Sequence, residues 1–475
     1  MKHSLDFYIN GKWVTPTDHN RIDVINPATE KPVGAISVGN ANDIDQAVQA
    51  ARAAFPTWSK STRNERLALL GQILAEYERR YDDMAAAITL EMGAPKNTSK
   101  DIQAAMGRTH VEAAITALET FEFSTDRGPT RIVKEAIGVC GFITPWNWPI
   151  NQVASKVAPA IATGCVMILK PSEIAPFSSI VWAEIMEAAG TPAGVFNLVN
   201  GDGPGAGAAL SCHPDVDMIS FTGSTRAGVE VAKNAAPTVK RVHQELGGKS
   251  ANILLPDADF DVAVEHCVRA VTLNSGQNCN APTRLLVPKD KMQDVEAIAL
   301  AVIETVSVGH PDNDIDMGPV VSKIQWDKIQ GLIKQGIQEG AHLVCGGLGL
   351  PEGLTAGYFV KPTIFSRANN QMQIAREEIF GPVLTIIGYA SVEEAVEIAN
   401  DTPYGLASYV SGRDQDLVKQ IASDLRSGQV VINCAAPDPM APFGGYKQSG
   451  NGREWGDFAF EEFLEIKAVL GFGKA

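Results

Sequence analysis

Short apolar strands alternate with helical segments between residues 138 and 221, and this alternation limits the possible folds more than any other feature of the chain. The strands are predicted at GVCGFIT (138–144), VMILK (166–170), VFNLV (195–199) and DMISF (217–221). One connecting helix ends at Gly164, and the other, PFSSIVWAEIMEAAG (176–190), begins with proline and ends with glycine, as helices commonly do. This β-α-β-α-β succession predicts an α/β fold with a parallel sheet and helices on its faces.

A second α/β series follows residue 245. Its predicted elements are a helix at 261–273, strands at 284–288, 358–365, 382–389 and 430–433, and helices near 321–339 and at 391–400. Ahead of both series, the strands FYI and KWV flank a turn at Asn10-Gly11, and helical stretches occupy roughly 42–120. The tail FAFEEFLEIKAVLGF (458–472) is partly alternating, which favours an edge strand that pairs with another element or subunit.

Composition excludes several classes of function. The net charge of −15 argues against nucleic-acid and anionic-membrane partners, which need a basic face. No run reaches the ~18 apolar residues of a membrane helix, and MKHSLDFYINGKWVTP lacks the apolar core of a signal peptide. The seven cysteines include no CxxC pair, so no metal site is predicted, and their unclustered odd number suits a cytoplasmic location.

The loop GQNCNAPTR (276–284) presents one cysteine, Cys279, among glycine and amide side chains. Most lone cysteines are small buried hydrophobic residues, and Cys165 and Cys267 fit that interpretation because they lie in apolar segments. Cys279 instead lies in a polar loop between a helix and a strand, where donors can stabilise a thiolate. We therefore predict that Cys279 is a nucleophile.

The motif ELGGKS (245–250) places Glu245 after the strand KRVHQ and before two glycines. Most glutamates are solvated surface carboxylates. A carboxylate in a partly apolar pocket has a raised pKa, which suits a general base at neutral pH. If Glu245 meets Cys279, the pair can form and then discharge a covalent acyl intermediate.

Two further loops are typical of nucleotide binding, although each is also compatible with an ordinary turn. FTGSTRAG (221–228) follows a strand and opens a helix, and a helix N-terminus attracts phosphate. KPSE (170–173) ends a strand, where Lys170 and Glu173 can bond ribose hydroxyls. Because Glu173 repels a 2′-phosphate, NAD is favoured over NADP.

Two aromatic loops complete the set. In PWNWP (145–149), Asn147 can direct its amide at an oxyanion, and such a donor is typically worth ~3 kcal/mol in the transition state. In EEIFGP (377–382), Glu378 can accept from a ribose and Phe380 can pack on a flat ring. Taken singly, PWNWP is also well explained as a rigid aromatic turn, and EEIFGP is better explained as a packed aromatic residue in a turn.

Seven motifs occur together and in this order: PWNWP, KPSE, FTGSTRAG, ELGGKS, GQNC, EEIFGP and PFGGYKQSGNGRE (442–454). This set resembles the aldehyde dehydrogenase superfamily, and the resemblance runs from FYINGKW to the tail. The resemblance implies a Rossmann-like NAD-binding domain, an α/β catalytic domain and a small β oligomerisation element. The implied boundaries are 1–120 and 140–246 for NAD binding, 247–432 for catalysis, 121–139 and 456–475 for oligomerisation, and 433–455 for a returning segment.

The resemblance also implies roles for single residues. Cys279 attacks the aldehyde, Asn147 and the Cys279 backbone N–H hold the oxyanion, Glu245 activates the hydrolytic water, and Lys170 joins this catalytic set. The implied cofactor contacts are Ile143, Pro145, Trp146, Lys170, Ser172, Glu173, Gly203, Gly207, Phe221, Gly223, Ser224, Leu246, Glu378 and Phe380. The implied assembly is a homodimer or a homotetramer.

Differences from the family concern the substrate pocket, which the resemblance assigns to Trp148, Gln152, Ser155, Asn278, Asn280, Asp438 and Phe443. Many relatives carry larger apolar groups where Gln152 and Ser155 stand. We therefore expect a roomy pocket with polar contacts, suited to a semialdehyde or a polar aromatic aldehyde, with Asp438 disfavouring an anionic tail.

Two alternatives stay open. A CoA-acylating enzyme of the superfamily passes the acyl group to CoA instead of water, and such enzymes typically lack the base that Glu245 matches. A catalytically inactive member with a structural or binding role would lack the nucleophile or the base, and both residues are present in this chain.

Overall fold

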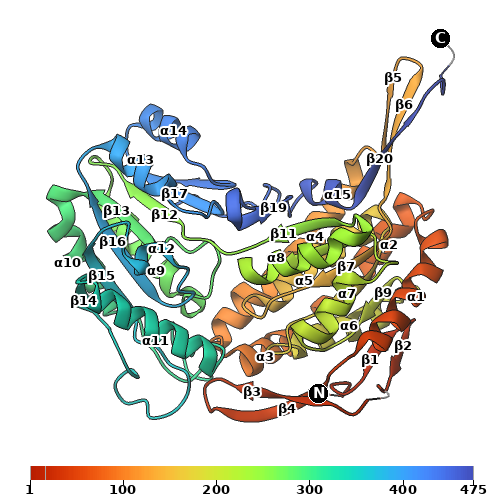
Figure 1. Cartoon of the computed structure of the whole chain (residues 1–475), viewed down its shortest axis with the longest axis horizontal. Helices are drawn as coiled ribbons and strands as arrows, with labels where there is room; N and C mark the ends of the chain where they lie inside the picture. The colour runs from red at the N-terminus through yellow and green to blue at the C-terminus, as the bar shows by residue number, and fades with distance from the viewer. Residues whose placement is uncertain (1, 17, 474–475) are drawn as a thin grey trace.

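The computed structural model describes residues 2–16 and 18–473, so residues 1, 17, 474 and 475 of the predicted ranges lie outside the described residues. Two α/β halves lie side by side, and a narrow β arm projects from one of them (Figure 1). Residues 251–432 supply the strands of one half, while residues 7–14, 139–245 and 450–451 supply the main sheet of the other. The roles in NAD binding, catalysis and oligomerisation that the resemblance implies for these regions stay predictions.

The first sheet has eight strands in the order β19-β11-β10-β7-β8-β9-β1-β2. The five central strands are parallel, as the sequence pattern predicted, and β1, β2 and β19 are antiparallel additions. The bounds are β1 Phe7–Ile9, β2 Lys12–Val14, β7 Val139–Ile143, β8 Val166–Lys170, β9 Phe196–Leu198, β10 Met218–Thr222, β11 Arg241–Glu245 and β19 Gly450–Asn451.

Helices cover both faces of this sheet (Figure 1). All of α5 is buried, since it packs against neighbouring helices and the sheet, and its apolar composition suits that position. The bounds are α1 Ala41–Trp58, α2 Arg63–Arg79, α3 Tyr81–Met92, α4 Ala105–Thr120, α5 Pro149–Thr163, α6 Phe177–Ala188, α7 Ala208–Cys212 and α8 Thr225–Ala235.

The second sheet has seven strands in the order β14-β15-β16-β13-β12-β17-β18, all parallel except β14. Its strands are β12 Ala251–Leu254, β13 Arg284–Pro288, β14 His342–Cys345, β15 Thr363–Ala368, β16 Val383–Tyr389, β17 Ala407–Ser411 and β18 Gln429–Ile432. Its helices are α9 Phe260–Thr272, α10 Met292–Ile303, α11 Lys323–Gln338, α12 Gln373–Arg376, α13 Val392–Asn400 and α14 Gln415–Asp424. The strand predicted at 358–365 begins only at Thr363, because the Tyr358 backbone is instead bonded to Pro27 and Val320.

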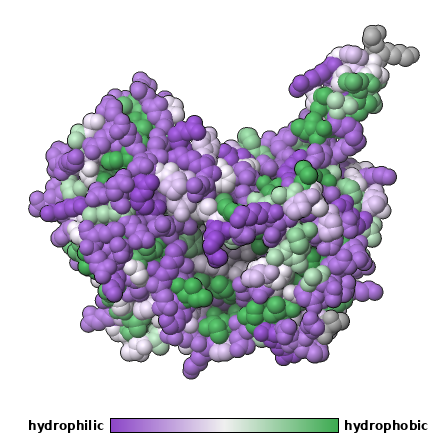
Figure 2. Space-filling model, viewed as in Figure 1, coloured by the Kyte–Doolittle hydropathy of each residue, from purple (hydrophilic) through white to green (hydrophobic). Residues whose placement is uncertain are grey.

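The arm is a three-stranded sheet in the order β20-β6-β5, with β5 Ser124–Arg127, β6 Thr130–Ala136 and β20 Leu464–Val469. The tail prediction was wrong in its first part, since Phe458–Glu462 forms helix α15; Ala459, Phe460 and Phe463 are buried at helical spacing. The arm carries apolar side chains into solvent (Figure 2), and Leu470 is 79% exposed. A separate hairpin, β3 Arg21–Asn26 with β4 Lys31–Ser37, lies along the base of the molecule in Figure 1.

The carboxyl ends of the central strands of the first sheet meet in one row. Ile143 pairs with both Lys170 and Phe221, and Thr222 pairs with Glu245. Open parallel sheets bind ligands at this edge, and the residues predicted to bind a nucleotide lie here. In the described part of the chain, no helix is long and apolar enough to cross a membrane.

Candidate active site

A cavity of about 200 Å³ lies at this edge of the first sheet and also contacts the second half of the molecule. Ten of its lining residues were predicted from the sequence, and they come from loops that are far apart in the chain. The predicted members are Pro145, Trp146, Asn147, Gln152, Gly223, Ser224, Leu246, Cys279, Glu378 and Phe380. Thr222, Gly247, Gln325 and Lys328 complete the lining and were not predicted.

The loop that carries Cys279 is held from both sides. Asn274, in a left-handed conformation at φ 55°, donates from its amide to the Asn147 carbonyl oxygen at 2.9 Å. The Gln277 amide donates to the Asn274 carbonyl oxygen at 3.0 Å and accepts from the Val321 N–H at 2.9 Å. These bonds fix the direction in which the partly exposed Cys279 enters the cavity.

The electrostatic surroundings of Cys279 differ from the sequence prediction of a stabilised thiolate. Burial raises the pKa of the thiol, and the carboxylates of Glu378 and Glu245 raise it further, while the backbone N–H groups of Cys279 and Asn280 lower it only in part. The loop does supply donors, but the loss of water outweighs them. The thiol is therefore protonated in this structure at neutral pH.

Glu245 lies close to this loop. The second glycine of its motif, Gly248, permits the approach, because a methyl group there would lie 2.3 Å from the Cys279 carbonyl oxygen. The Glu245 carboxyl group is 2% exposed and does not line the cavity. Burial, and then the nearby Glu454 carboxylate, raise the pKa of Glu245 well above its ordinary value.

A buried ion pair lies behind Glu245. Lys156 of α5 pairs with Glu454 and donates to the Thr222 hydroxyl at 2.8 Å, and the Ser155 hydroxyl donates to Glu454 at 3.3 Å. Burial opposes ionisation of Glu454, but the Lys156 ammonium group outweighs it and lowers the pKa of that carboxyl group. Glu454 therefore carries a negative charge near the base, and Lys156 balances that charge.

Asn147 and Glu378 both line the cavity. The Asn147 amide donates to the Gln277 carbonyl oxygen at 3.0 Å, and one Glu378 oxygen accepts from the Gly248 N–H at 2.9 Å. The Trp146 and Phe380 rings meet edge to face, with their centroids 5.4 Å apart. The two aromatic loops therefore form one wall beside the thiol.

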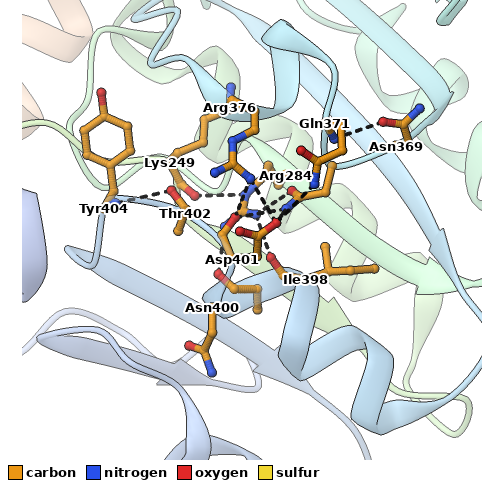
Figure 3. Close-up of polar contacts among 12 residues, drawn as sticks. Lys249, Arg284, Asn369, Gln371, Arg376, Ile398, Asn400, Asp401, Thr402 and Tyr404 are labelled. Atoms are coloured by element: carbon orange, nitrogen blue, oxygen red, sulfur yellow. Dashed lines mark hydrogen bonds and ion pairs between the residues drawn. The ribbon is translucent and has the colours of Figure 1, made fainter.

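Arg284 anchors the back of the ELGGKS loop (Figure 3). Its guanidinium group is fully buried and donates to the carbonyl oxygens of Lys249, Ile398 and Ala399 and to the side chain of Asn370. Five donors in a rigid fork suit such a cluster of acceptors. The Lys249 ammonium group has no hydrogen-bond partner within the described residues, and burial followed by Arg284 lowers its pKa to about 7.

The residues predicted to hold an adenosine ribose and phosphates lie along the strand ends next to the cavity. Lys170 contacts Glu173 at 3.3 Å, and Gly207 approaches the Lys170 stem. Ser224 caps α8 by accepting from the Ala227 N–H. Ser172 bonds within its own turn, and Gly203 begins a short π-helical segment, Gly203–Gly207, without close neighbours.

The residues predicted for the substrate pocket do not form one network of contacts. The Trp148 indole donates to Asn278 at 2.6 Å, and the Asn280 carbonyl oxygen accepts from Tyr409 at 2.9 Å. Phe443 is buried and stacks on Trp455 with ring centroids 4.5 Å apart. Asp438 is exposed, and its carboxylate accepts from the Met440 N–H at 2.9 Å in its own loop.

Of the residues missed by sequence reasoning, Thr222 and Gly247 lie within the FTGSTRAG and ELGGKS motifs, whereas Gln325 and Lys328 carried no local signal. Gln325 and Lys328 lie in α11, which reads as an ordinary amphipathic helix, yet Gln325 donates to the Phe380 carbonyl oxygen at 2.7 Å. Across residues 2–16 and 18–473, no group of three acidic, cysteine or histidine side chains is arranged to hold a metal ion.

Comparisons with known proteins agree with this geometry. The chain matches the aldehyde dehydrogenase family over residues 13–469. It is 56% identical to 3-succinoylsemialdehyde-pyridine dehydrogenase of a Pseudomonas species, over 99% of each chain. A mutant of aldehyde dehydrogenase C from Pseudomonas syringae, solved with NAD+ and octanal, is 50% identical, with a TM-score of 0.99 over 100% of this chain and 98% of that one. Betaine aldehyde dehydrogenase of Staphylococcus aureus, solved with NAD+, is 35% identical, with a TM-score of 0.95 over 99% and 95%.

Proposed function

The chain belongs to the aldehyde dehydrogenase family, and we propose from this premise that it oxidises an aldehyde to its carboxylic acid with NAD as hydride acceptor. One observation carries the proposal above all others. Cys279 supplies a thiol and Asn147 an amide donor from separate loops of one cavity, and the buried carboxyl group of Glu245 lies at the end of β11 close to the Cys279 loop.

The residues around the cavity fit NAD. Ser224 begins α8, and a helix N-terminus suits a pyrophosphate. Glu378 offers a carboxylate for ribose hydroxyls, and the Lys170–Glu173 pair offers both a donor and an acceptor at the strand ends. When bound, NAD supplies an acceptor for the hydride that leaves the substrate carbon.

The chemistry of the chain follows from these positions. The Cys279 thiol releases its proton to solvent water and its sulfur adds to the aldehyde carbon, while the oxyanion accepts from the Asn147 amide and the Cys279 N–H. Loss of the hydride restores the carbonyl group as a thioester. Glu245 then takes a proton from water, the resulting hydroxide adds to the thioester, and the Cys279 thiolate leaves with the carboxylic acid as product.

For the substrate, we propose a semialdehyde or an aldehyde with a polar aromatic group. Amide groups flank the nucleophile at Asn278 and Asn280, and Gln152 lines the cavity. The relative at 56% identity is named for a semialdehyde that carries a pyridine ring, while the relative solved with octanal supports a longer aliphatic chain as the comparison substrate.

The test is the rate of NADH formation with a panel of aliphatic, aromatic and semialdehyde substrates, each with NAD and NADP. Cys279→Ser is expected to abolish oxidation. Glu245→Gln is expected to keep a first burst of NADH and to lose turnover by about 100-fold or more. Normal turnover of Glu245→Gln would overturn the assignment of the base, and a best kcat/KM for acetaldehyde would overturn the substrate class.

The same assay separates the two alternatives. A CoA-acylating enzyme would require CoA for steady NADH formation and would release an acyl-CoA. A structural member would fold but produce no NADH from any aldehyde in the panel. We expect steady NADH formation without CoA, because the chain retains Glu245.

A further inference from the structure

His243 lies beside the proposed base in a position that the family motifs do not cover. It precedes Glu245 by two residues in β11, so both side chains emerge on the same face of the strand. Both are buried. The ring atom Nε2 of His243 lies 3.7 Å from Oε1 of Glu245.

The His243 ring and the Glu245 carboxyl group are polar neighbours that are not hydrogen-bonded to each other. Among the described residues, neither carboxyl oxygen of Glu245 has a hydrogen-bond partner, and neither does Nε2 of His243. A separation of 3.7 Å exceeds a hydrogen bond, but a small rotation of the Glu245 side chain closes it. Leaving both buried groups unbonded is costly, which favours that rotation.

The other ring nitrogen has an adaptable partner. Nδ1 of His243 lies 2.9 Å from the Ser220 hydroxyl oxygen, and a hydroxyl group can donate or accept. If Nδ1 donates to Ser220, Nε2 accepts from a protonated Glu245. If Ser220 donates to Nδ1, Nε2–H donates to an ionised Glu245.

The ring is fixed in place. A methyl group on Gly452, whose φ is +79°, would lie 2.2 Å from Cδ2 of His243, so the loop backbone packs directly on the imidazole. Burial lowers the pKa of His243 to about 4, so the ring is neutral at neutral pH. The charged groups facing this pair are Lys156 of α5, Glu454 and Arg453 of the following loop, and Glu462 of α15.

We propose that His243 is a positioning residue for the base: with the Ser220 hydroxyl donating to Nδ1, its Nε2–H donates to ionised Glu245 and holds that carboxylate in place. The proposal rests on the role of Glu245 given above. It explains how a deeply buried carboxyl group is kept ionised and ready to take a proton from water. The ring stays neutral and takes no proton from the base.

The experiment compares His243→Met with His243→Gln, because methionine removes the polar atom at the Nε2 position while glutamine keeps an amide there. The readouts are the NADH burst, the steady-state rate from pH 6 to 10 and the melting temperature. In His243→Met we expect an unchanged burst, a steady-state rate about tenfold lower at neutral pH, and an apparent pKa about one pH unit higher. The shift is upward because ionised Glu245 loses a charge-assisted bond. We expect His243→Gln to recover most of the rate.

Three outcomes would overturn the proposal. They are a wild-type pH profile in His243→Met, equal damage in the methionine and glutamine variants, and equal loss of burst and steady-state rate, which indicates a purely structural role. If His243→Met does not fold, Ser220→Ala decides, since it removes only the partner of Nδ1 and is expected to shift the profile in the same direction by a smaller amount. Turnover in Glu245→Gln would refute the base and this proposal together, whereas an inactive Glu245→Gln with an unaltered His243→Met would refute only the role of His243.

Discussion

Lys156 and Glu454 form the most deeply buried ion pair near the site, and removing one partner should cost more than removing both charges. Their side chains are 1% and 5% exposed. Lys156→Met leaves the Glu454 carboxylate without its counter-ion, and breaking a buried pair in this way typically costs about 3–5 kcal/mol. In the double variant Lys156→Met/Glu454→Gln, no unpaired charge remains, so most of that loss should be recovered.

This cost can be converted into a melting temperature. Unfolding entropy is about 2.1 cal/mol/K per residue, which for 475 residues gives about 1 kcal/mol/K if the whole chain unfolds together. The single variant should therefore melt about 4 °C below the wild type, and the double variant within about 1–2 °C of it. Calorimetry at one fixed scan rate is the assay, because long chains often unfold irreversibly.

The stability that the Lys156–Glu454 pair contributes should depend on pH in a defined direction. The pKa of Glu454 is lowered in the folded chain, so the stability that the pair contributes is present above pH 4.5 and is lost as pH falls through the folded pKa. The gap between the wild type and Lys156→Met should then shrink in acid. A double variant as unstable as the single one, or a gap that does not change with pH, would refute this reasoning.

Three other predictions concern separate residues. Burial lowers the pKa of Lys249 from 10.5 to about 7; the unfolded chain keeps this proton up to pH 10.5, so wild-type stability should rise between pH 7 and 10 by up to about 4 kcal/mol. Melting of Lys249→Met over that range should lack this rise, and parallel curves would contradict it. Gly452→Ala forces a methyl group against His243 and should cost about 1–3 kcal/mol and slow turnover; an unchanged Tm and kcat would exclude the contact. Glu173→Gln should raise the NADP-to-NAD ratio of kcat/KM about tenfold by removing a like charge, and an unchanged ratio would show that Glu173 does not face the 2′ position.

The strands of the first sheet could be predicted because each is a short apolar run buried on both faces, as VMILK of β8 illustrates. The cavity loops could be predicted because Cys279 and Glu378 lie in distinctive loops next to strand or helix ends. The places of Gln325 and Lys328 in the cavity lining could not be predicted, because they depend on how α11 packs against the rest of the molecule. This packing leaves no pattern in the sequence.

Two differences between the sequence predictions and the structure have separate physical causes. The expected thiolate at Cys279 was inferred from polar neighbours in sequence, but a pKa depends on desolvation, which is a property of the folded structure. The tail was read as one strand because its apolar residues suit both periods, and packing selected a helix at Phe458–Glu462 before the strand at Leu464–Val469.

The outer edge of β11, the strand that ends in Glu245, is covered by residues 450–451 of β19. During synthesis at about 5–20 residues per second, that edge waits roughly 10 to 40 seconds for its neighbour to emerge from the ribosome. Over this interval the nascent chain exposes unpaired backbone donors and acceptors next to its reactive carboxyl group, so it needs protection from association with other nascent chains. The sheet edge beside Glu245 is thus completed only when translation is almost finished.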